Sequence, residues 1–374
     1  MFKKVLIVLM IGCFILGMAT REEAEKAVKE ETTTTTNAES SVDRGSVIPL
    51  EKWERNKRVD DKVYKIADEL EEICEKNNNN YEAIGWSMSA ARLVGELKEL
   101  GDDALPAIYD VAKDTSRNEL LRILMTERLA FSYEPAVTKP LMNFLTDKNE
   151  SERMRVNVAE LLGRILKDST SAPALIEIME DKSNPESVRA QAAHAFVFID
   201  DERAVKPLLD NVESDPSLDV KRISISALGA IGRDTDNREM VNPLLGIVDN
   251  GEKVEKGAND YSEKKTLQYH AISSLGAMKE EKVVPLLSKK VKSEDKSNLY
   301  VAIWALGNIG GSEAQGILLQ LLKDKDKGTR FDAAKALLKM DDKSIVPEVE
   351  NVLPTLEVYQ RNMLSDSLQK FKER

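Results

Sequence analysis

The sequence contains few residues of the kinds that most often carry catalysis. Of its 374 residues, 2 are cysteine, 2 are histidine and 5% are aromatic. Cys13 and Cys74 lie too far from a second cysteine pair to form a disulfide framework or a thiolate metal site. The histidines, His194 and His270, are also far apart along the chain. We therefore expect no metal site and no bound cofactor.

Common nucleotide-binding and nucleophile motifs are missing too. There is no Gly-x-x-x-x-Gly-Lys loop to hold a phosphate and no Gly-x-Ser-x-Gly turn to present a serine. The formal net charge of -11 would repel phosphate-rich partners on average. The sequence thus favours a protein without catalytic activity and without a nucleic-acid partner.

The residues that are abundant suit short amphipathic helices. Ala, Leu, Val, Ile, Lys and Glu dominate, and 32% of the chain is charged, which predicts an all-α protein. Proline recurs along most of the chain, with intervals of 33 to 42 residues between the first six. Because proline is tolerated in the first turn of a helix, this recurrence marks helix starts. These prolines are Pro106, Pro140, Pro173, Pro207, Pro243, Pro285 and Pro347.

A second recurring sequence pattern lies before each of these prolines, and we call its aligned positions the register. Leucine, usually followed by glycine, recurs there with small apolar residues three and four positions earlier. Small residues let neighbouring helices approach closely, and a unit of one helical pair can bury its apolar face only by stacking. The aligned leucines followed by glycine are Leu162, Leu228, Leu275 and Leu306, and Phe196 and Leu337 stand in the same register.

These residues resemble the HEAT repeat family, in the short form known as phycobilisome-lyase HEAT-like repeats. The match rests on Val188-Arg189 with Ala192-Ala193, and on the segments 204–209, 227–232 and 305–310. The resemblance implies an α-solenoid of about eight helical hairpins over residues 86–354. N-terminal capping helices are expected over 47–85 and a C-terminal capping helix over 355–374.

The resemblance also implies an internal ladder of charged residues between repeats. Its basic members would stand seven residues before the aligned leucine, and aspartates would close the second helices. A basic binding surface is the alternative interpretation. The ladder candidates are Arg155, Arg189, Lys221 and Arg330, with Asp147, Asp181 and Asp215.

Some proteins of this fold are enzymes. Deoxyhypusine hydroxylase is similar in fold and binds a di-iron centre through His-Glu pairs, but His194 and His270 are each followed by alanine here. The bilin lyases share the repeat, and a shared fold does not transfer an activity. We expect a scaffold or adaptor that holds another protein. A lyase-like or cofactor-handling enzyme and a purely structural envelope component are the alternatives.

The N-terminus has the pattern of an export signal. Lys3 and Lys4 precede an apolar run, and Met1 to Ala19 ends in small residues suited to a signal peptidase. Cys13 lies in a possible lipobox, so lipidation there and an uncleaved N-terminal membrane anchor are the alternatives to cleavage after Ala19. Residues 20–46 are polar and predict a disordered tether. We expect an exported protein of the periplasm or cell envelope.

Candidate partner-binding residues come from the repeats and from their irregularities. Position two before the aligned leucine is polar in most repeats and Trp304 in one, which predicts either an exposed anchor or a ring packed on a neighbour. Tyr261 falls in an irregular segment, 250–264, expected as a polar loop that could contact a ligand. Since the second helices usually line the concave face in this family, the resemblance adds Lys206, Asp210, Asn242 and Lys289.

Two further residues have ordinary structural interpretations. Cys74 lies among helix-forming and acidic residues, so we expect a buried apolar residue and not a reactive thiol. His194 occupies the polar register position and is expected at the solvated surface.

Overall fold

The computed structural model describes residues 47–85, 87–253 and 258–373. These residues form helices and turns, without any β-strand among them. The chain divides into two compact units, the first ending at Ser171 and the second beginning at Ala172. The prediction of an all-α solenoid is confirmed. Cys13, the expected signal and the expected tether lie outside the described residues, and no described helix is long and apolar enough to cross a membrane.

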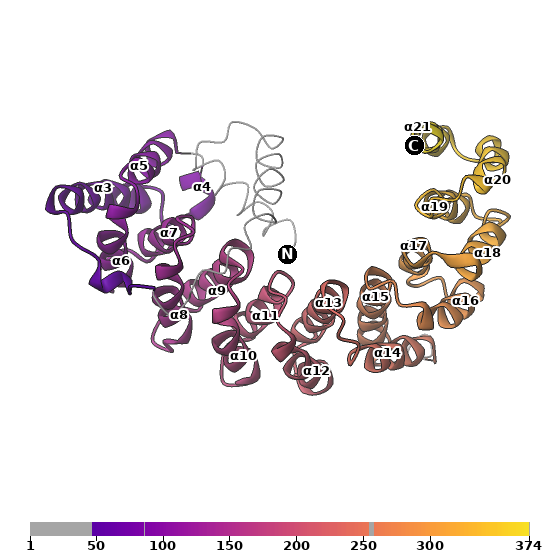
Figure 1. Ribbon diagram of the computed structural model, residues 1–374, viewed down its shortest axis with the longest axis horizontal. Coiled ribbons are helices and arrows are strands. Elements are labelled where there is room, and N and C mark those ends of the chain that lie inside the picture. The colour runs from indigo at the N-terminus through magenta and orange to yellow at the C-terminus, as the bar shows by residue number, and fades with distance from the viewer. Residues whose placement is uncertain (1–46, 86, 254–257, 374) are drawn as a thin grey trace. The chain divides into compact units, whose positions relative to one another are not determined.

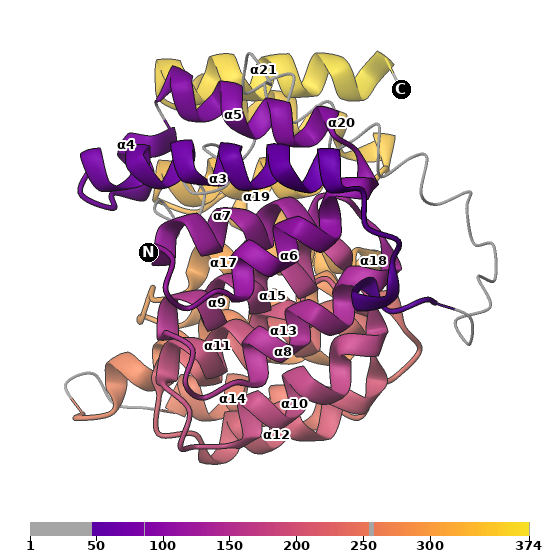
Figure 2. The same cartoon turned by 90° about the vertical axis from the view of Figure 1, so that its left-hand side faces the viewer.

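The first unit contains helices over residues 47–85, the segment expected to cap the solenoid, and the first hairpins. Figure 2 shows α3 beside α5 at one end of this unit, and both α4 and α7 also contact α3. Its helices are α3 (Lys57–Lys76), α4 (Tyr81–Gly85), α5 (Met88–Glu99), α6 (Leu105–Lys113), α7 (Glu119–Ala130), α8 (Thr138–Thr146) and α9 (Glu152–Glu160), with a π-helical turn at Leu161–Leu166. Short 3-10 turns lie at Leu50–Lys52, Asp102–Ala104, Pro135–Val137 and Ser169–Ser171.

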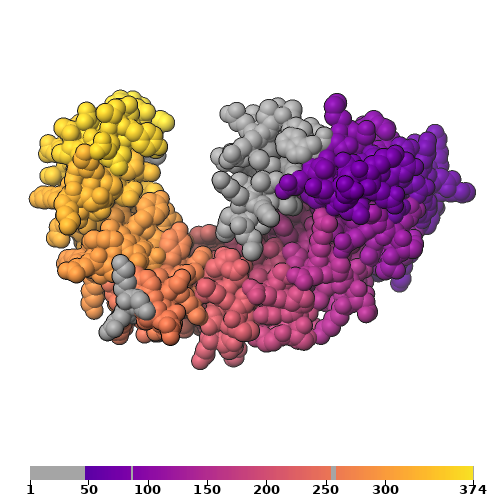
Figure 3. All heavy atoms as spheres, turned by 180° about the vertical axis from the view of Figure 1, so that it is seen from behind, coloured from indigo at the N-terminus to yellow at the C-terminus, as the bar shows by residue number. Residues whose placement is uncertain are grey.

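The second unit contains the remaining helices, which stack in continuous contact from magenta to yellow in the space-filling view (Figure 3). They are α10 (Ala172–Glu180), α11 (Glu186–Ala195), α12 (Val205–Ser214), α13 (Leu218–Asp234), α14 (Val241–Lys253), α15 (Tyr261–Ala277), α16 (Val284–Lys292), α17 (Leu299–Ile309), α18 (Gly311–Leu321), α19 (Lys327–Leu337), α20 (Val346–Val352) and α21 (Val358–Glu373). Its 3-10 turns are Glu202–Ala204, Glu281–Val283, Lys343–Ile345 and Leu353–Thr355.

The recurring prolines begin helices, as the sequence predicts. Pro106, Pro173, Pro285 and Pro347 are the second residues of α6, α10, α16 and α20. Proline lacks an N–H there that no intrahelical carbonyl would have accepted, so the helix loses nothing. Pro140, Pro207 and Pro243 are the third residues of α8, α12 and α14.

The Leu-Gly register marks close helix crossings. The aligned leucines of α13, α15, α17 and α19 are completely buried. A Cβ built on Gly229 of α13 would lie 2.4 Å from Ser274 Oγ of α15, and one on Gly307 of α17 would lie 2.8 Å from Ala336 Cβ of α19. A larger residue at either glycine would force the two helices apart. The register therefore sets the spacing between neighbouring repeats.

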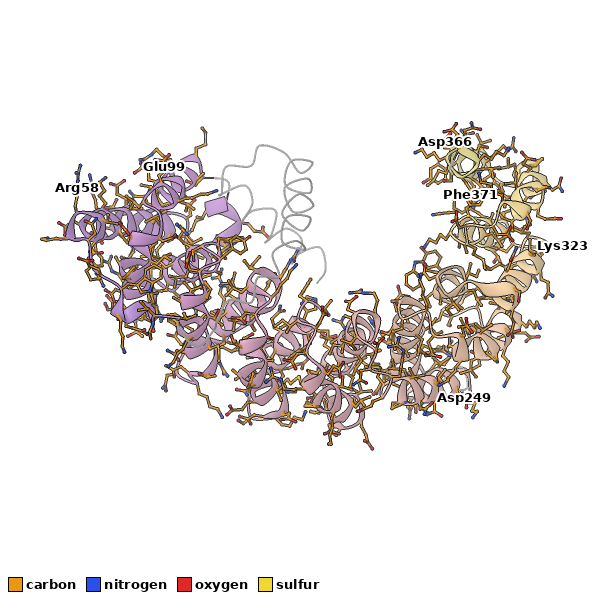
Figure 4. The ribbon with its side chains drawn as sticks, viewed as in Figure 1. Arg58, Glu99, Asp249, Lys323, Asp366 and Phe371 are labelled. Atoms are coloured by element: carbon orange, nitrogen blue, oxygen red, sulfur yellow. The ribbon has the colours of Figure 1, made fainter. Side chains whose placement is uncertain are left out.

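The helices of the second unit form two rows (Figure 1). The inner row, α11, α13, α15, α17, α19 and α21, lies on the concave side of this unit, and its members pack closely on one another. The outer row, α10, α12, α14, α16, α18 and α20, contains the helices opened by proline, and Figure 4 shows Asp249 of α14 on this outer side. The expectation that the second helices line the concave face is thus wrong for this unit.

The expected ladder is present within each unit. Arg189 Nη2 pairs with Asp215 Oδ1 at 3.0 Å, and both side chains are buried. Arg155 Nε donates to the carbonyl of Leu145 at 2.9 Å, and Arg330 Nη2 donates to the carbonyl of Thr355 at 2.8 Å. Because each arginine satisfies a helix end or a corner of its own or the next hairpin, the ladder joins consecutive repeats.

Cys74 is completely buried in α3 and free. Burial raises the pKa of its thiol to about 11, with a contribution from the Glu71 charge. A thiol that stays protonated at neutral pH is a poor nucleophile, which agrees with the interpretation of Cys74 as an apolar core residue.

Candidate protein-binding surface

Three aromatic residues occupy one register position in consecutive inner helices of the second unit. Tyr269 of α15, Tyr300 of α17 and Phe331 of α19 each stand six residues before the aligned leucine. We call these three residues the aromatic column. The same position in α13 and α11 holds Arg222 and Ala190, so the column is a departure from the repeat.

The aromatic column is open to solvent. Tyr269 is 41% exposed and Tyr300 is 59% exposed, while Phe331 is partly buried. Their position on the inner row follows from the helix period, which turns the aligned leucine and the small residues before it into the core. Exposed aromatic rings on rigid helices are typical of binding surfaces, because they bury much apolar area with little loss of conformational entropy.

Trp304 lies one helical turn after Tyr300 on the same helix and is partly buried. A Cβ built on Gly276 would come within 3.1 Å of Trp304 Cζ3, so the ring packs over that glycine. Lys339 Nζ lies 5.4 Å from the centroid of the ring. Both interpretations of Trp304 hold in part. The ring packs on neighbouring helices, and the rest of its surface contributes to the open face.

A shallow hollow of about 330 Å³ lies at the start of α15 and reaches Tyr269. It is lined by Tyr261, Ser262, Lys265, Thr266, Tyr269 and Asn298. Tyr261 is the first residue of α15, and its hydroxyl lies 2.8 Å from Ser297 Oγ. The expectation of a polar loop over 250–264 is wrong at both ends, because α14 continues to Lys253 and α15 begins at Tyr261; residues 258–260 form a turn, and residues 254–257 lie outside the described part.

A paired charge cluster forms the base of this hollow. Lys265 Nζ donates to the carbonyl of Gly251 at 2.7 Å and pairs with Asp295 Oδ2 at 2.7 Å. Burial opposes ionisation of Asp295, but hydrogen bonds from Lys265 and Ser297 outweigh it and hold the pKa of Asp295 well below its usual range. These charges neutralise one another, so this cluster joins α14 and α15 to the turn between α16 and α17.

The first unit uses the corresponding surface differently. In the first unit, Leu129 of α7 and Leu162, just after α9, hold the leucine position, and Glu127 and Glu160 stand two residues before them. Tyr81 of α4 donates its hydroxyl to Glu127 Oε1 at 2.7 Å. Burial raises the pKa of Glu127 to about 7, opposed by the Tyr81 hydrogen bond and assisted by the Glu160 charge. Here the short helix α4 covers the register that is open in the second unit.

The outer-row candidates lie apart from this surface. Lys206 and Asp210 of α12 form an exposed pair at 2.8 Å. Asn242 of α14 and Lys289 of α16 are exposed. The structure brings none of the four together with Trp304, because they lie on outer-row helices. Their role in binding stays a prediction.

The two histidines do not form a shared centre. His194 is partly buried and its ring meets Phe198 edge-on, with the ring centroids 5.4 Å apart. His270 Nδ1 lies 3.2 Å from Ser226 Oγ, and burial lowers the His270 pKa to about 4 with help from the Arg222 charge. Within the described residues, no group of three or more His, Cys, Asp or Glu side chains is arranged to hold a metal ion.

Sequence reasoning missed the aromatic column although its signal was present. The position six before the leucine can be read directly from the register, and aromatic residues fill it only in α15, α17 and α19 among the inner helices from α11 to α19. The position two before the leucine reveals only Trp304 as an unusual residue.

Several solved structures are similar to this chain in fold. Human deoxyhypusine hydroxylase, in complex with glycerol, is 16% identical with a TM-score of 0.33, over 75% of this chain and 100% of that one. The complex of CpcE and CpcF of phycocyanin lyase from Nostoc gives 18% identity and a TM-score of 0.39, over 71% and 94%. The Escherichia coli protein YibA gives 17% and 0.44, over 77% and 98%. No curated protein matches the sequence.

The model of the HEAT repeats matches residues 138–229, 252–338 and 290–357, which together are more than half of the chain. The matched residues include the Leu-Gly crossings of α13, α15 and α17 and the inner helices that carry the aromatic column. This chain belongs to the HEAT repeat family.

Proposed function

We propose that this protein is a non-catalytic scaffold that binds another protein through the inner surface of its second unit. The observation that carries the proposal is the aromatic column, which is exposed where the repeat needs no aromatic residue. An exposed tyrosine adds nothing to the stacking of repeats, whereas the buried leucines beside it do. Aromatic side chains held on rigid helices are enriched among the residues that dominate binding energy at protein interfaces.

The surface has the features of such an interface. Tyr300 and Trp304 stand one turn apart on α17, and Trp304 is held in place by Gly276 below it and Lys339 beside it. A preorganised ring loses little entropy when a partner covers it. The polar residues of the hollow next to Tyr269 supply a rim that stays hydrated.

We further propose that the scaffold works in the cell envelope, because Met1 to Ala19 has the pattern of an export signal. The mass of the mature N-terminus tests this separately. A chain that begins after Ala19, or one lipidated at Cys13, supports export with a cleaved signal, whereas an intact Met1 contradicts both and leaves an uncleaved N-terminal anchor as the only route to the envelope.

Site-specific photocrosslinking tests the binding surface. The probe p-benzoylphenylalanine replaces Tyr300 in one variant and Asn242, an exposed outer-row residue, in a matched control. We expect an adduct with one protein of defined mass from position 300 and none from position 242. Adducts from 242 alone would favour the outer-row residues instead. A chromophore or metal that co-purifies in stoichiometric amount would favour the cofactor-handling alternative.

A further inference from the structure

Two lysines next to the aromatic column have no acidic partner among the residues the structure describes. Lys335 Nζ lies 5.3 Å from the centroid of the Phe331 ring, and Lys339 Nζ lies 5.4 Å from that of Trp304. Lys339 also donates a hydrogen bond of 3.4 Å to Asn308 Oδ1. We call Lys335 and Lys339 the lysine pair.

Several lysines of the second unit form ion pairs, whereas others, among them the exposed Lys282 and Lys289, have none among the described residues. Lys265 pairs with Asp295, Lys327 with Glu357 and Lys253 with Asp249. What distinguishes Lys335 and Lys339 from the other unpaired lysines is that each ammonium group lies against an aromatic ring of the open face. Asp332, one turn before Lys335, interacts with it through space without forming an ion pair, and burial raises the pKa of Asp332 although the Lys335 charge opposes this. The lysine pair is therefore a local positive site.

The surroundings of the lysine pair favour the binding of an anion. An ammonium group has three donors, and a ring face occupies only one side of it. Burial lowers the pKa of Lys339, and the charge of Lys335 lowers it further. A carboxylate placed between the two groups would relieve their repulsion and satisfy their free donors.

The dimensions of the aromatic column set the length of a peptide that could cover it. Packed helices lie about 10 Å apart, so the aromatic column spans about 20 Å from α15 to α19. An extended peptide rises about 3.3 Å per residue and would cross that span in about six residues. In the polyproline II conformation, which has three residues per turn and rises about 3.1 Å per residue, every third side chain faces the same way and would meet successive rings.

We infer that the aromatic column and the lysine pair recognise an acidic peptide segment that crosses α15, α17 and α19. Apolar side chains of the segment lie on the rings, and its carboxylates meet the lysine pair. This inference rests on the proposed function, for which it names the partner's chemistry. Single-stranded nucleic acid also stacks on aromatic rings, but its repeated phosphates need a longer basic groove than two lysines, and the chain's acidic charge opposes it.

Selection from a random peptide library tests the inference. The full chain selects from displayed peptides of about 12 residues, long enough to cover the surface twice. Three proteins are compared: the natural chain, the Lys335→Gln/Lys339→Gln variant, and a charge-matched control, Lys282→Gln/Lys289→Gln, which removes two exposed lysines near α16. We expect the natural chain and the control to select peptides rich in Asp and Glu, and the first variant to lose that enrichment.

Titration of a selected peptide separates the acidic-segment inference from the proposed protein-binding function. Lys335→Gln/Lys339→Gln is expected to weaken an acidic peptide about tenfold and to leave its Gln-substituted analogue unchanged, since only the charged pairs are lost. Tyr300→Ala is expected to weaken both peptides. Neutral or basic selected peptides, or preferential binding of oligothymidylate, would overturn the acidic-segment inference alone. Selection of no peptide, or of peptides insensitive to Tyr300→Ala, would overturn the proposed function as well.

Discussion

The same register positions of the helices are covered in the first unit and open to solvent in the second. In the first unit, Glu127 and Glu160 occupy the position two before the leucine, and Tyr81 of α4 closes over Glu127. In the second unit, Trp304 and Lys335 occupy that position in α17 and α19, beside the open aromatic column. The repeat framework is shared, so the difference lies in what covers it. We propose that the binding surface lies where the register departs from the repeat and no capping helix covers it.

The charged ladder should contribute similarly to the stability of both units. Arg189→Ala leaves Asp215 buried with only Lys182 and backbone as partners, and we expect a loss of about 3 kcal/mol in the free energy of unfolding. Urea denaturation measures it. Arg122→Ala in the first unit, where Arg122 pairs with Glu150, should lose a similar amount. Lys206→Ala, at an exposed pair, serves as the control and should change little. An unaffected Arg189→Ala protein would show that the ladder does not stabilise the repeats.

The covered face of the first unit should make stability depend on pH. The Glu127 pKa is raised from 4.5 to about 7, so the folded state keeps a proton that the unfolded state releases. Stability attributable to Glu127 is therefore full below about pH 4.5, falls as pH rises towards 7 and is constant above, a loss of roughly 2 kcal/mol after allowance for partial exposure. Denaturation at pH 5 and pH 8 measures it. Glu127→Gln, which keeps the shape without the charge, should remove most of the difference, and an unchanged difference would contradict this origin.

The hydrogen bond from Tyr81 should matter more when Glu127 is ionised. Tyr81→Phe removes the donor at 2.7 Å without opening a cavity, and we expect a loss of about 1.5 kcal/mol at pH 8 and less at pH 5. Thermal unfolding at both pH values gives the comparison. Tyr64→Phe, in the same unit but bonded to Asp110, is a matched control with no such dependence on Glu127. Equal losses at both pH values for Tyr81→Phe would place the ionisation elsewhere.

The open face should be nearly irrelevant to stability. Tyr300→Ala removes a ring that is 59% exposed, so the free energy of unfolding should change by less than about 0.5 kcal/mol. Circular dichroism during urea denaturation measures this. Leu306→Ala on the same helix, whose leucine is completely buried, should cost about 3 kcal/mol. A large loss from Tyr300→Ala would mean that the aromatic column serves the fold.

The framework could be predicted from the sequence because its signals are local and repeated. Proline in the first turn and leucine followed by glycine depend on the geometry of one helix or of one crossing, and Gly229 and Gly307 both lie at such crossings. The contact between Tyr81 and Glu127 could not be predicted, because they are far apart in sequence and α4 stands outside the repeat.

The open surface was only partly predictable. Trp304 was identified from its register, but its packing on Gly276 of α15 and near Lys339, in the turn after α19, depends on neighbouring repeats. Tyr261 was placed in a loop because the long interval between prolines suggested an insertion, whereas extension of α14 and α15 takes up most of that interval. Which row of helices is concave follows from the packing of the whole unit, which no single repeat encodes.

The central claim is that the second unit binds its protein partner through the aromatic column and Trp304. Isothermal titration of the partner captured at position 300 tests it most directly. The account predicts that Tyr300→Ala/Trp304→Ala weakens binding by about 100-fold, as expected for two aromatic anchors, while the outer-row variant Lys206→Ala/Lys289→Ala stays within about twofold of the natural chain. Equal affinity of the natural chain and the Tyr300→Ala/Trp304→Ala variant would contradict the account.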